Sequence, residues 1–258
     1  MENQEFKQPP VLDVIPPIES HLFDDYEQAV FWVGKVAVPG CVTCPDEYTA
    51  QRQLRANVYI EECNFLPPTA RQADGGESDA SDANATQYVV LEHRNQQTKA
   101  VGSLRMIHKQ QGTLPAEELF ADELKQELPS QSLEASRFIA RHNEKMAQAL
   151  ISIGLVRVAI LQALNEQGDI YAVVEEPLAR RFSQIGLEYD LLCPGKPISE
   201  YNNTNNMLLR FRPDQIMETV KKDYRYDRMI TAYLDIAHLN NGLGYYDKTM
   251  RNVARKGI

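Results

Sequence analysis

A long apolar helix between two strands constrains the fold of this chain more than any other feature. Residues 143–166 have the longest helical pattern, with apolar residues spaced for one buried face. A strand pattern precedes this helix at 132–140, and a short apolar strand follows it at 169–174. Strands on both sides of a helix predict an α/β protein.

The remaining strand patterns indicate a mixed sheet. Strands at 87–93 and 100–107 are separated by a polar turn and are typical of an antiparallel hairpin. A helix is predicted at 177–184, and two further strands at 187–192 and 207–212. We therefore predict an α/β sandwich with a central mixed, mostly antiparallel sheet flanked by helices.

Four other segments have weaker patterns. We expect a short helix at 24–35 and a stronger one at 46–63, which begins after a proline and has a buried face. Residues 67–86 contain two prolines and two glycines and are predicted to form a surface loop. Residues 115–128 are expected to form a polar helix or a lid.

The two ends of the chain are predicted to lie outside the main domain. Residues 1–20 are rich in proline and are expected to form an extended lead-in. The main domain is predicted to span residues 21–212, and residues 213–258 to form a helical C-terminal extension. No role follows from the sequence of this extension.

Composition limits the classes of partner. The net charge is −9, with 10 Lys and Arg against 21 Asp and Glu in residues 1–130, and 17 against 15 in residues 131–258. This balance argues against a general nucleic-acid binder, because phosphate contacts need a basic surface. We expect neither a secretory leader nor a membrane-spanning segment. We expect a cytoplasmic protein whose membrane contact is peripheral at most.

Four cysteines are too few and too scattered for a disulfide scaffold. Cys41 and Cys44 have the spacing of a zinc or redox pair, but no second pair follows at a usual distance. We therefore expect two reduced thiols near a turn and no bound metal.

Four short motifs follow one another in an informative order. They are Leu54-Arg55, the acidic run 77–82, the strand segment 102–105 and the strand 133–138, which reads Leu-Glu-Ala-Ser-Arg-Phe. An arginine, a carboxylate cluster and a strand that carries Glu, Ser and Arg are suited to binding an amine and transferring an acyl group to it. The signal lies in their order and spacing.

These motifs resemble those of the GNAT-like acyltransferases of the acyl-homoserine-lactone synthase type. The resemblance spans about residues 46–212 and is closest to the N-acyl amino acid synthases and the exosortase-associated acyltransferases. The matching positions are Arg55, Tyr59, Phe65, Glu77, Asp79, Asp82, Arg105, Glu134, Ser136, Arg137 and Phe138. The resemblance implies a GNAT-like fold and an acyltransferase that joins a fatty acyl group to a small amine.

The resemblance also implies roles for these residues. Glu134 and Ser136 are the predicted catalytic residues. The residues predicted to bind substrate are Arg55, Tyr59, Phe65, Asp79, Asp82, Arg105, Arg137 and Phe138. Tyr59 stands where the family usually has phenylalanine, and Phe65 where the lactone synthases have tryptophan. Both departures favour an amino acid or similar small amine over S-adenosylmethionine as acceptor.

Glu134 is the candidate general base. A free ammonium cannot attack a thioester, so a base must first remove a proton. A carboxylate beside an apolar acyl tunnel has its pKa raised towards neutrality, which suits that role. Strict alternation places Glu134, Ser136 and Phe138 on one face and Arg137 on the other, unless a bulge intervenes. Backbone amides of this strand are candidates to bind the oxyanion, and the alternative role for Glu134 is a structural ion pair.

The three arginines near the acidic run allow two interpretations. Arg55, Arg105 and Arg137 either orient the aspartates and bind a substrate carboxylate, or form a structural network that closes loop 67–86. The sequence is compatible with both at once.

The turn after the motif strand bears on the acyl donor. Coenzyme A-dependent GNAT enzymes bind the pyrophosphate with a glycine-rich turn at this point, whereas residues 141–145 contain no glycine. This favours acyl carrier protein as partner, with acyl-phosphopantetheine as donor substrate and no tightly bound cofactor. Basic residues that would meet its acidic surface are Arg141, Lys145, Arg180 and Arg181, unless they are ordinary solvated charges.

Three alternatives stay open from the sequence. One is an acyl-homoserine-lactone synthase that uses S-adenosylmethionine, and a second is a coenzyme A-dependent acetyltransferase. The third is a non-catalytic acyl-binding or regulatory module. Acyl chain length, acceptor identity and oligomeric state are not specified.

Overall fold

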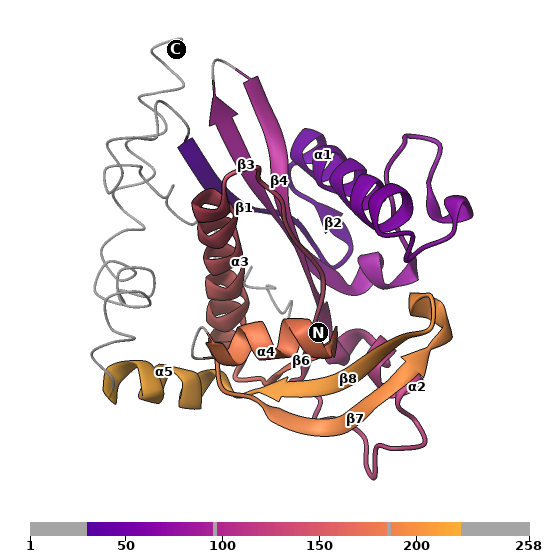
Figure 1. Ribbon diagram of the computed structural model, residues 1–258, viewed down its shortest axis with the longest axis vertical. Coiled ribbons are helices and arrows are strands. Elements are labelled where there is room, and N and C mark those ends of the chain that lie inside the picture. Colours follow the sequence, from indigo (N-terminus) through magenta and orange to yellow (C-terminus); the bar gives the residue numbers. More distant parts are fainter. Residues whose placement is uncertain (1–29, 95–96, 185–186, 223–258) are drawn as a thin grey trace, which may run out of the picture.

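An eight-stranded mixed sheet organises the chain (Figure 1). The computed structural model describes residues 30–94, 97–184 and 187–222. The strand order is β2-β1-β3-β4-β5-β6-β8-β7. The strands are β1 (Val30–Val38), β2 (Cys41–Val42), β3 (Ala85–Arg94), β4 (Gln97–His108), β5 (Leu133–Ala140), β6 (Ile170–Glu175), β7 (Asp190–Ile198) and β8 (Thr204–Phe211).

The pairing confirms the predicted mixed sheet. Within the described chain, β5 and β6 are parallel and the other neighbouring strands are antiparallel. The parallel pair is connected by the long helix, as a parallel connection requires.

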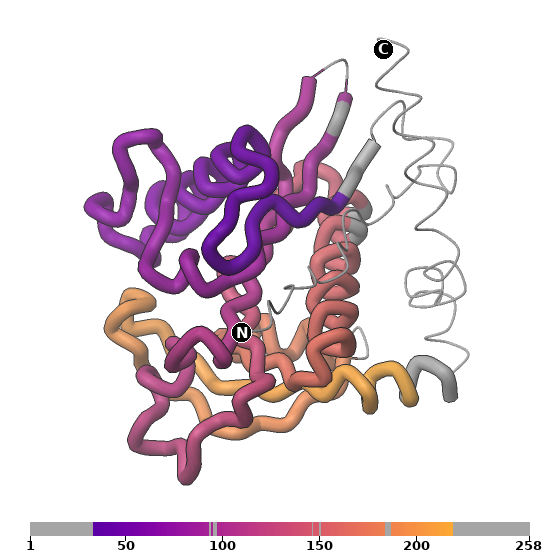
Figure 2. The backbone as a smooth tube through the Cα atoms, turned by 180° about the vertical axis from the view of Figure 1, so that it is seen from behind, coloured from indigo at the N-terminus to yellow at the C-terminus, as the bar shows by residue number. Residues whose placement is uncertain are grey.

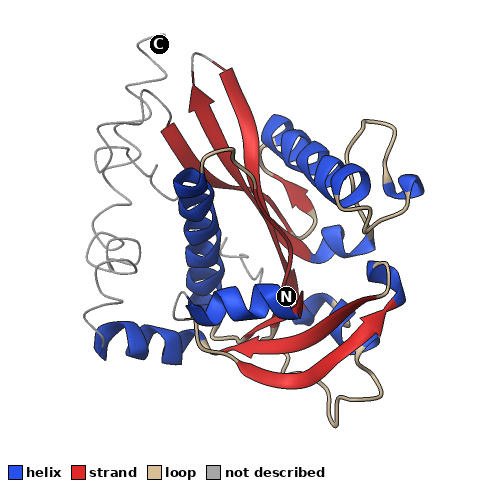
Figure 3. Cartoon of the chain, in the orientation of Figure 1, coloured by secondary structure: helices blue, strands red, loops and turns tan. Residues whose placement is uncertain are grey.

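Helices cover both faces of this sheet (Figures 2 and 3). The α-helices are α1 (Pro45–Ala56), α2 (Pro115–Leu119), α3 (Lys145–Glu166), α4 (Glu176–Gln184) and α5 (Pro213–Lys222). The π-helix η2 (Asn57–Glu62) continues α1, and short 3-10 helices are η3 (Pro68–Ala70), η4 (Ala80–Asn84), η5 (Lys109–Gln111) and η6 (Ser199–Tyr201). The main core packs α3, α4 and α5 on one face, whereas α2 belongs to a second cluster and α1 covers a third.

Helix α3 lies close against β4. A Cβ atom at Gly102 would lie 2.7 Å from Ile151 Cγ2, so glycine permits this approach. We expected no membrane-spanning segment, but Ala147–Glu166 is long and apolar enough to span a membrane by length and composition. Ile151 and Leu155 are buried in the main core, so α3 serves as a core helix here.

Two sequence predictions about local structure are wrong. The helix predicted at 24–35 is a strand from residue 30 onward, and residues 24–29 lie outside the described chain. Pairing of β1 with β3 buries Val33 and Val36, and this tertiary pairing overrides the helical pattern. Segment 115–128 is helical only in α2, and Phe120 and Leu128 anchor it in the second core cluster.

The predicted terminal segments are covered only in part. Helix α5 begins the expected C-terminal extension, and its Ile216 and Met217 are buried in the main core. The described part of this extension therefore packs on the domain. Residues 1–20 and 223–258 lie outside the described chain.

Candidate functional site

A β-bulge interrupts the motif strand β5. Arg105 of β4 pairs with Ser136, and Ser103 pairs with Ile139, so two residues of β5 oppose Leu104. Arg137 occupies the left-handed region with φ of 52°, which is uncommon for a residue with a side chain. A bulge at this point interrupts the strict alternation of side chains along β5.

The bulge changes the faces on which the following side chains lie. Arg137 joins Ser136 on the face of the acidic loop, where it binds Glu77 and Asp79. Phe138 packs against the main core beneath α3 instead of sharing a face with Ser136, so the strict alternation prediction is wrong for both residues.

Strands β5 and β6 diverge immediately after they meet. Their pairing is limited to Leu133 with Ile170 and Glu134 with Tyr171. Beyond Glu134, a cavity of about 460 Å³ opens between the two strands. The edge of β5 that faces β6 therefore borders this cavity, where its backbone groups have no neighbouring strand.

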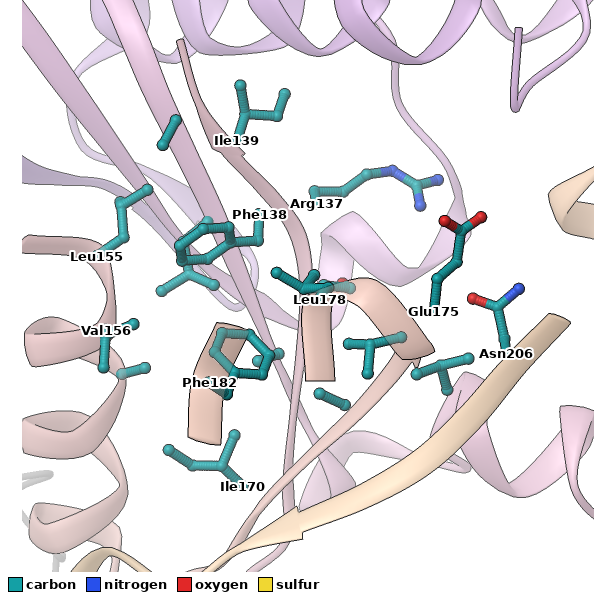
Figure 4. Close-up of a pocket in the computed structure, with 18 of the residues that line it drawn as sticks. Arg137, Phe138, Ile139, Leu155, Val156, Ile170, Glu175, Leu178, Phe182 and Asn206 are labelled. Carbon is teal, nitrogen blue, oxygen red and sulfur yellow. The ribbon is translucent and has the colours of Figure 1, made fainter. Parts of the chain in front are cut away.

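The cavity is apolar inside and polar at one end. Its apolar wall comes from β5, β6, α3 and α4 and includes Phe138, Ile139, Leu155, Val156, Ile170, Leu178 and Phe182 (Figure 4). The labelled polar side chains are Arg137, Glu175 and Asn206, which lie together at one side of this wall. An elongated apolar group with a polar end would match this lining.

Tyr59 and Phe65 form an aromatic pair at the border of the cavity. Their ring centroids lie 6.4 Å apart, and both residues line the cavity. The hydroxyl of Tyr59 donates a hydrogen bond of 3.2 Å to the carbonyl oxygen of Phe138, and the guanidinium of Arg137 lies 5.3 Å from the Tyr59 ring centroid. The π-helix η2 carries Tyr59, and π-turns of this kind are frequent at functional sites.

Three arginines and three carboxylates form a compact charge network, which comprises Arg55, Arg105, Arg137, Glu77, Asp79 and Asp82. Arg55 is fully buried and binds Glu77 and Asp82. Since buried charges require partners, this balanced network explains how the acidic loop closes over the sheet. The structural interpretation of the arginines is therefore correct.

Two members of the network connect it to the motif strand. Arg105 donates from Nη1 to Asp79 Oδ1 at 2.6 Å and to Asp82 Oδ1 at 2.8 Å. From Nε it donates to the Ser136 hydroxyl at 2.9 Å. Arg137 donates from Nη2 to Asp79 Oδ2 at 2.9 Å. Ser136 thus belongs to the network and also lines the cavity.

The arginines of the network lower the pKa values of its two aspartates. Burial favours the neutral form of Asp82, but Arg55 and Arg105 outweigh burial and lower its pKa to about 2. Asp79 behaves similarly: Arg105 and Arg137 overcome its burial and lower its pKa. Both aspartates are therefore ionised at neutral pH and neutralise the arginines.

Glu134 has the raised pKa expected of the candidate base. Its side chain is almost fully buried, and this desolvation raises its pKa to about 7, despite a hydrogen bond from the Ala116 backbone N–H. That N–H lies 2.8 Å from Oε2 of Glu134. Glu134 is not among the residues that line the cavity.

The predicted donor-binding residues lie at two places beside the cavity. Arg141 and Lys145 are exposed near the start of α3, and Arg141 pairs with Glu62. Arg180 and Arg181 are exposed on α4, where Arg180 pairs with the exposed Glu176. Arg141 lies in the turn before α3 and lines the cavity, Lys145 is the first residue of α3, and Arg180 and Arg181 lie on α4, which also borders the cavity.

The turn between β5 and α3 is occupied by its own side chains. His142 accepts a hydrogen bond on Nδ1 from the backbone N–H of Glu144, at 3.0 Å. Its Nε2 lies 3.4 Å from Glu92 Oε1. One backbone donor at the start of α3 is thereby used within the protein, and Glu144 adds an acidic side chain there.

Sequence reasoning missed three polar residues near the site. Gln51 lies one helical turn before Arg55 and donates to the backbone oxygen of Tyr88, which its spacing could have signalled. Gln87 donates to Asp82 at 2.9 Å. Glu175 lines the cavity at the end of β6, and no sequence signal distinguishes it from a solvated glutamate.

One known domain family is similar to part of the chain. Residues 54–171 match the acetyltransferase (GNAT) domain family. This segment, 118 of the 258 residues, is similar to GNAT acyltransferase domains. This match covers the acidic loop, the bulged strand and the point where β5 and β6 diverge. No curated protein sequence matches the chain.

Solved structures show the same fold for the GNAT domain. TofI, solved in a ternary complex with an inhibitor and MTA, has 19% identity and a TM-score of 0.54, covering 71% of this chain and 91% of TofI. The CoA-dependent acyl-homoserine lactone synthase BjaI, solved with SAM and isopentyl-CoA, has 19% identity and a TM-score of 0.52, covering 69% and 82%. The AHL synthase LasI has 16% identity and a TM-score of 0.52, covering 72% and 90%. At this identity the likeness concerns the fold, and the acyltransferase class follows from the domain.

Proposed function

We propose that this protein is an N-acyltransferase that moves a fatty acyl group from acyl carrier protein to the amine of an amino acid or similar small amine. The single observation that carries this proposal is the apolar cavity that opens where β5 and β6 diverge. Its apolar wall suits an acyl chain, and its polar side suits the reacting groups.

The reaction needs a neutral amine and a polarised thioester. The amine nitrogen forms a bond to the thioester carbonyl carbon, the carbon–sulfur bond breaks, and the thiolate leaves. One proton is removed from the ammonium before attack, and a second passes from nitrogen to the departing sulfur. The products are an N-acyl amine and the free thiol of phosphopantetheine.

Glu134 is proposed to accept the first proton. Its pKa of about 7 gives a substantial ionised fraction at neutral pH together with sufficient basicity. Because Glu134 does not line the cavity, the proton would travel through an intermediary such as a water molecule. Ser136 lies on the same strand and lines the cavity, so we propose that it takes part in this proton transfer.

The backbone of β5 is proposed to stabilise the oxyanion. Its edge beyond Glu134 is not paired to β6, so amide groups on that edge are available to a bound thioester. The Tyr59 hydroxyl donates a hydrogen bond to the Phe138 carbonyl oxygen. This bond holds that oxygen away from the developing negative charge. The guanidinium of Arg137, which pairs with Glu77 and Asp79, lies at the same side of the cavity.

Acyl carrier protein is the proposed donor because the β5–α3 turn is poorly suited to a pyrophosphate. His142 uses one amide donor there, and Glu144 adds negative charge where an anion would bind. The exposed Arg141, Lys145, Arg180 and Arg181 are proposed to meet the acidic carrier. BjaI, which has this fold, is described with isopentyl-CoA, so coenzyme A thioesters are the necessary comparison.

The experiment is product analysis with purified protein. The protein is incubated with acyl carrier protein and coenzyme A thioesters of graded length, a pool of amino acids and S-adenosylmethionine, and products are read by mass spectrometry. An N-acyl amino acid formed faster from the carrier thioester supports the proposal. A homoserine lactone would contradict the proposed acceptor, and intact donors would support the non-catalytic module. A cytoplasmic location is part of the same proposal, since acyl carrier protein would have to reach the enzyme.

A further inference from the structure

Glu175 places a carboxylate at the polar side of the apolar cavity. It is the last residue of β6 and pairs with Asn206 of β8, and both residues line the cavity. Figure 4 shows the side chains of Glu175 and Arg137 extending from the two diverging strands towards the same open region. Glu175 therefore lies where the head of a bound acyl chain would meet a second substrate.

The Glu175 carboxylate differs from the acidic loop because it has no cation of its own. No hydrogen bond or ion pair joins it to another residue of the described chain. Arg137 points the same way but is already bound to Glu77 and Asp79. The negative charge of Glu175 is thus left available to a ligand.

The lining of the cavity also includes aromatic surface. Cys63 also lines the cavity, and burial and the charge of Glu175 raise the pKa of its thiol, which places Glu175 near the end of η2. The aromatic pair Tyr59 and Phe65 lines the cavity as well. A cavity lined by both a carboxylate and aromatic rings is an environment that attracts an organic cation.

We propose that Glu175 binds the ammonium group of the acceptor and so restricts acceptors to amines that are cationic in solution. This inference rests on the proposed function and names its acceptor-binding residue. The ammonium would be held beside the gap between β5 and β6, next to the thioester carbonyl. Glu175 would then act mainly on acceptor binding, while Glu134 acts on proton removal.

The test compares two probes that differ only in the amine. L-phenylalanine methyl ester carries an ammonium group, and methyl 3-phenylpropanoate is the same ester without it. Binding of each to the wild type, Glu175→Gln and Glu175→Asp is measured by calorimetry at pH 6, where the amine of the amino ester is mainly protonated. Glu176→Gln is the matched control, because Glu176 is the next residue and is exposed on α4, where it pairs with Arg180.

We expect the wild type to bind the amine ester about tenfold or more tightly than its deaminated analogue, which corresponds to about 1.4 kcal/mol. Glu175→Gln should abolish this preference, while Glu175→Asp and Glu176→Gln should retain it. Far-ultraviolet circular dichroism checks that each variant is folded. Equal preference in the wild type and Glu175→Gln, or no preference in the wild type, would overturn the inference.

Acyl transfer with the same proteins separates the two proposals. If ammonium binding depends on Glu175 but no thioester is consumed, the proposed function fails and the binding site stands. If Glu175→Gln transfers acyl groups with an unchanged KM for the amine, the binding site fails and the proposed function stands.

Discussion

The hydroxyl of Tyr59 donates a hydrogen bond to the carbonyl oxygen of Phe138, 79 residues further along the chain. The bond joins the π-helix after α1 to the bulge in β5. It joins the aromatic border of the cavity to the strand that carries the Leu-Glu-Ala-Ser-Arg-Phe motif. This neutral hydrogen bond therefore helps to position one wall of the cavity, together with the contacts of the Tyr59 ring with Phe65 and Arg137.

Replacing Tyr59 by phenylalanine should loosen this wall. Tyr59→Phe keeps the ring beside Phe65 but removes the donor, which should cost about 1 kcal/mol of unfolding free energy. We also expect a raised KM for the acceptor, because the border of the cavity is less fixed. Urea titration and steady-state kinetics measure the two effects. Tyr48→Phe is the control, and equal effects of both variants would contradict the assigned role.

Glu77 should be among the most sensitive positions for stability. Its side chain is buried between Arg55 and Arg137, so Glu77→Gln leaves two buried cations short of charge. Loss of one partner from a buried ion pair costs about 3–5 kcal/mol. The matched control is Glu61→Gln, whose exposed pair with Arg71 should contribute less than about 1 kcal/mol. Denaturant titrations that give similar losses for both variants would contradict a structural network.

Glu134 should make the stability of the protein fall as pH rises. Its folded pKa of about 7 lies above the ordinary value of 4.5, so the fold favours the protonated carboxyl. This contribution is complete below pH 4.5 and is lost as the pH rises through 7. The difference amounts to about 3 kcal/mol between these limits.

Glu134→Gln should remove that pH dependence because glutamine does not titrate. The measurement is the unfolding free energy of wild type and variant at a series of pH values from acid to neutral. The difference between the two proteins isolates Glu134 from other titrating groups. An identical slope in both proteins would show that folding does not raise the pKa of Glu134, which would remove a main support for its role as the proposed base.

Val156 should limit the length of the acyl chain. It lies on α3 and lines the cavity, so Val156→Phe would fill part of the apolar space. We expect kcat/KM for the longest donors to fall about tenfold or more, with short donors little affected. Ile153→Phe is the control, since Ile153 is also on α3 and does not line the cavity. Uniform loss across all chain lengths would indicate damage to the fold instead.

The charge network was accessible from sequence because its members obey a simple physical requirement. Buried arginines need carboxylates, and the chain offers Arg55, Arg105 and an acidic run in a suitable order. The strand–helix–strand pattern around α3 likewise predicted the sheet that supports them. These features depend on residue type and spacing, which sequence retains.

The details that shape the cavity depend on tertiary pairing. Arg137 adopts a left-handed conformation although arginine has no special preference for it, so no residue type signals the bulge. Strand β1 exists because β3 offers it an edge. Glu175 becomes notable only when β5 and β6 diverge and expose it to the cavity.

The most direct test of the central claim is the release of thiol from an acyl donor with and without an amine. Purified protein is mixed with acyl carrier protein thioester, free thiol is followed over time, and the N-acyl product is quantified in the same samples. We predict that thiol release requires the amine and matches product one to one, and that Glu134→Gln slows both equally. Thiol release without amine, or an unchanged rate in Glu134→Gln, would contradict an amine acyltransferase that uses this carboxylate as its base.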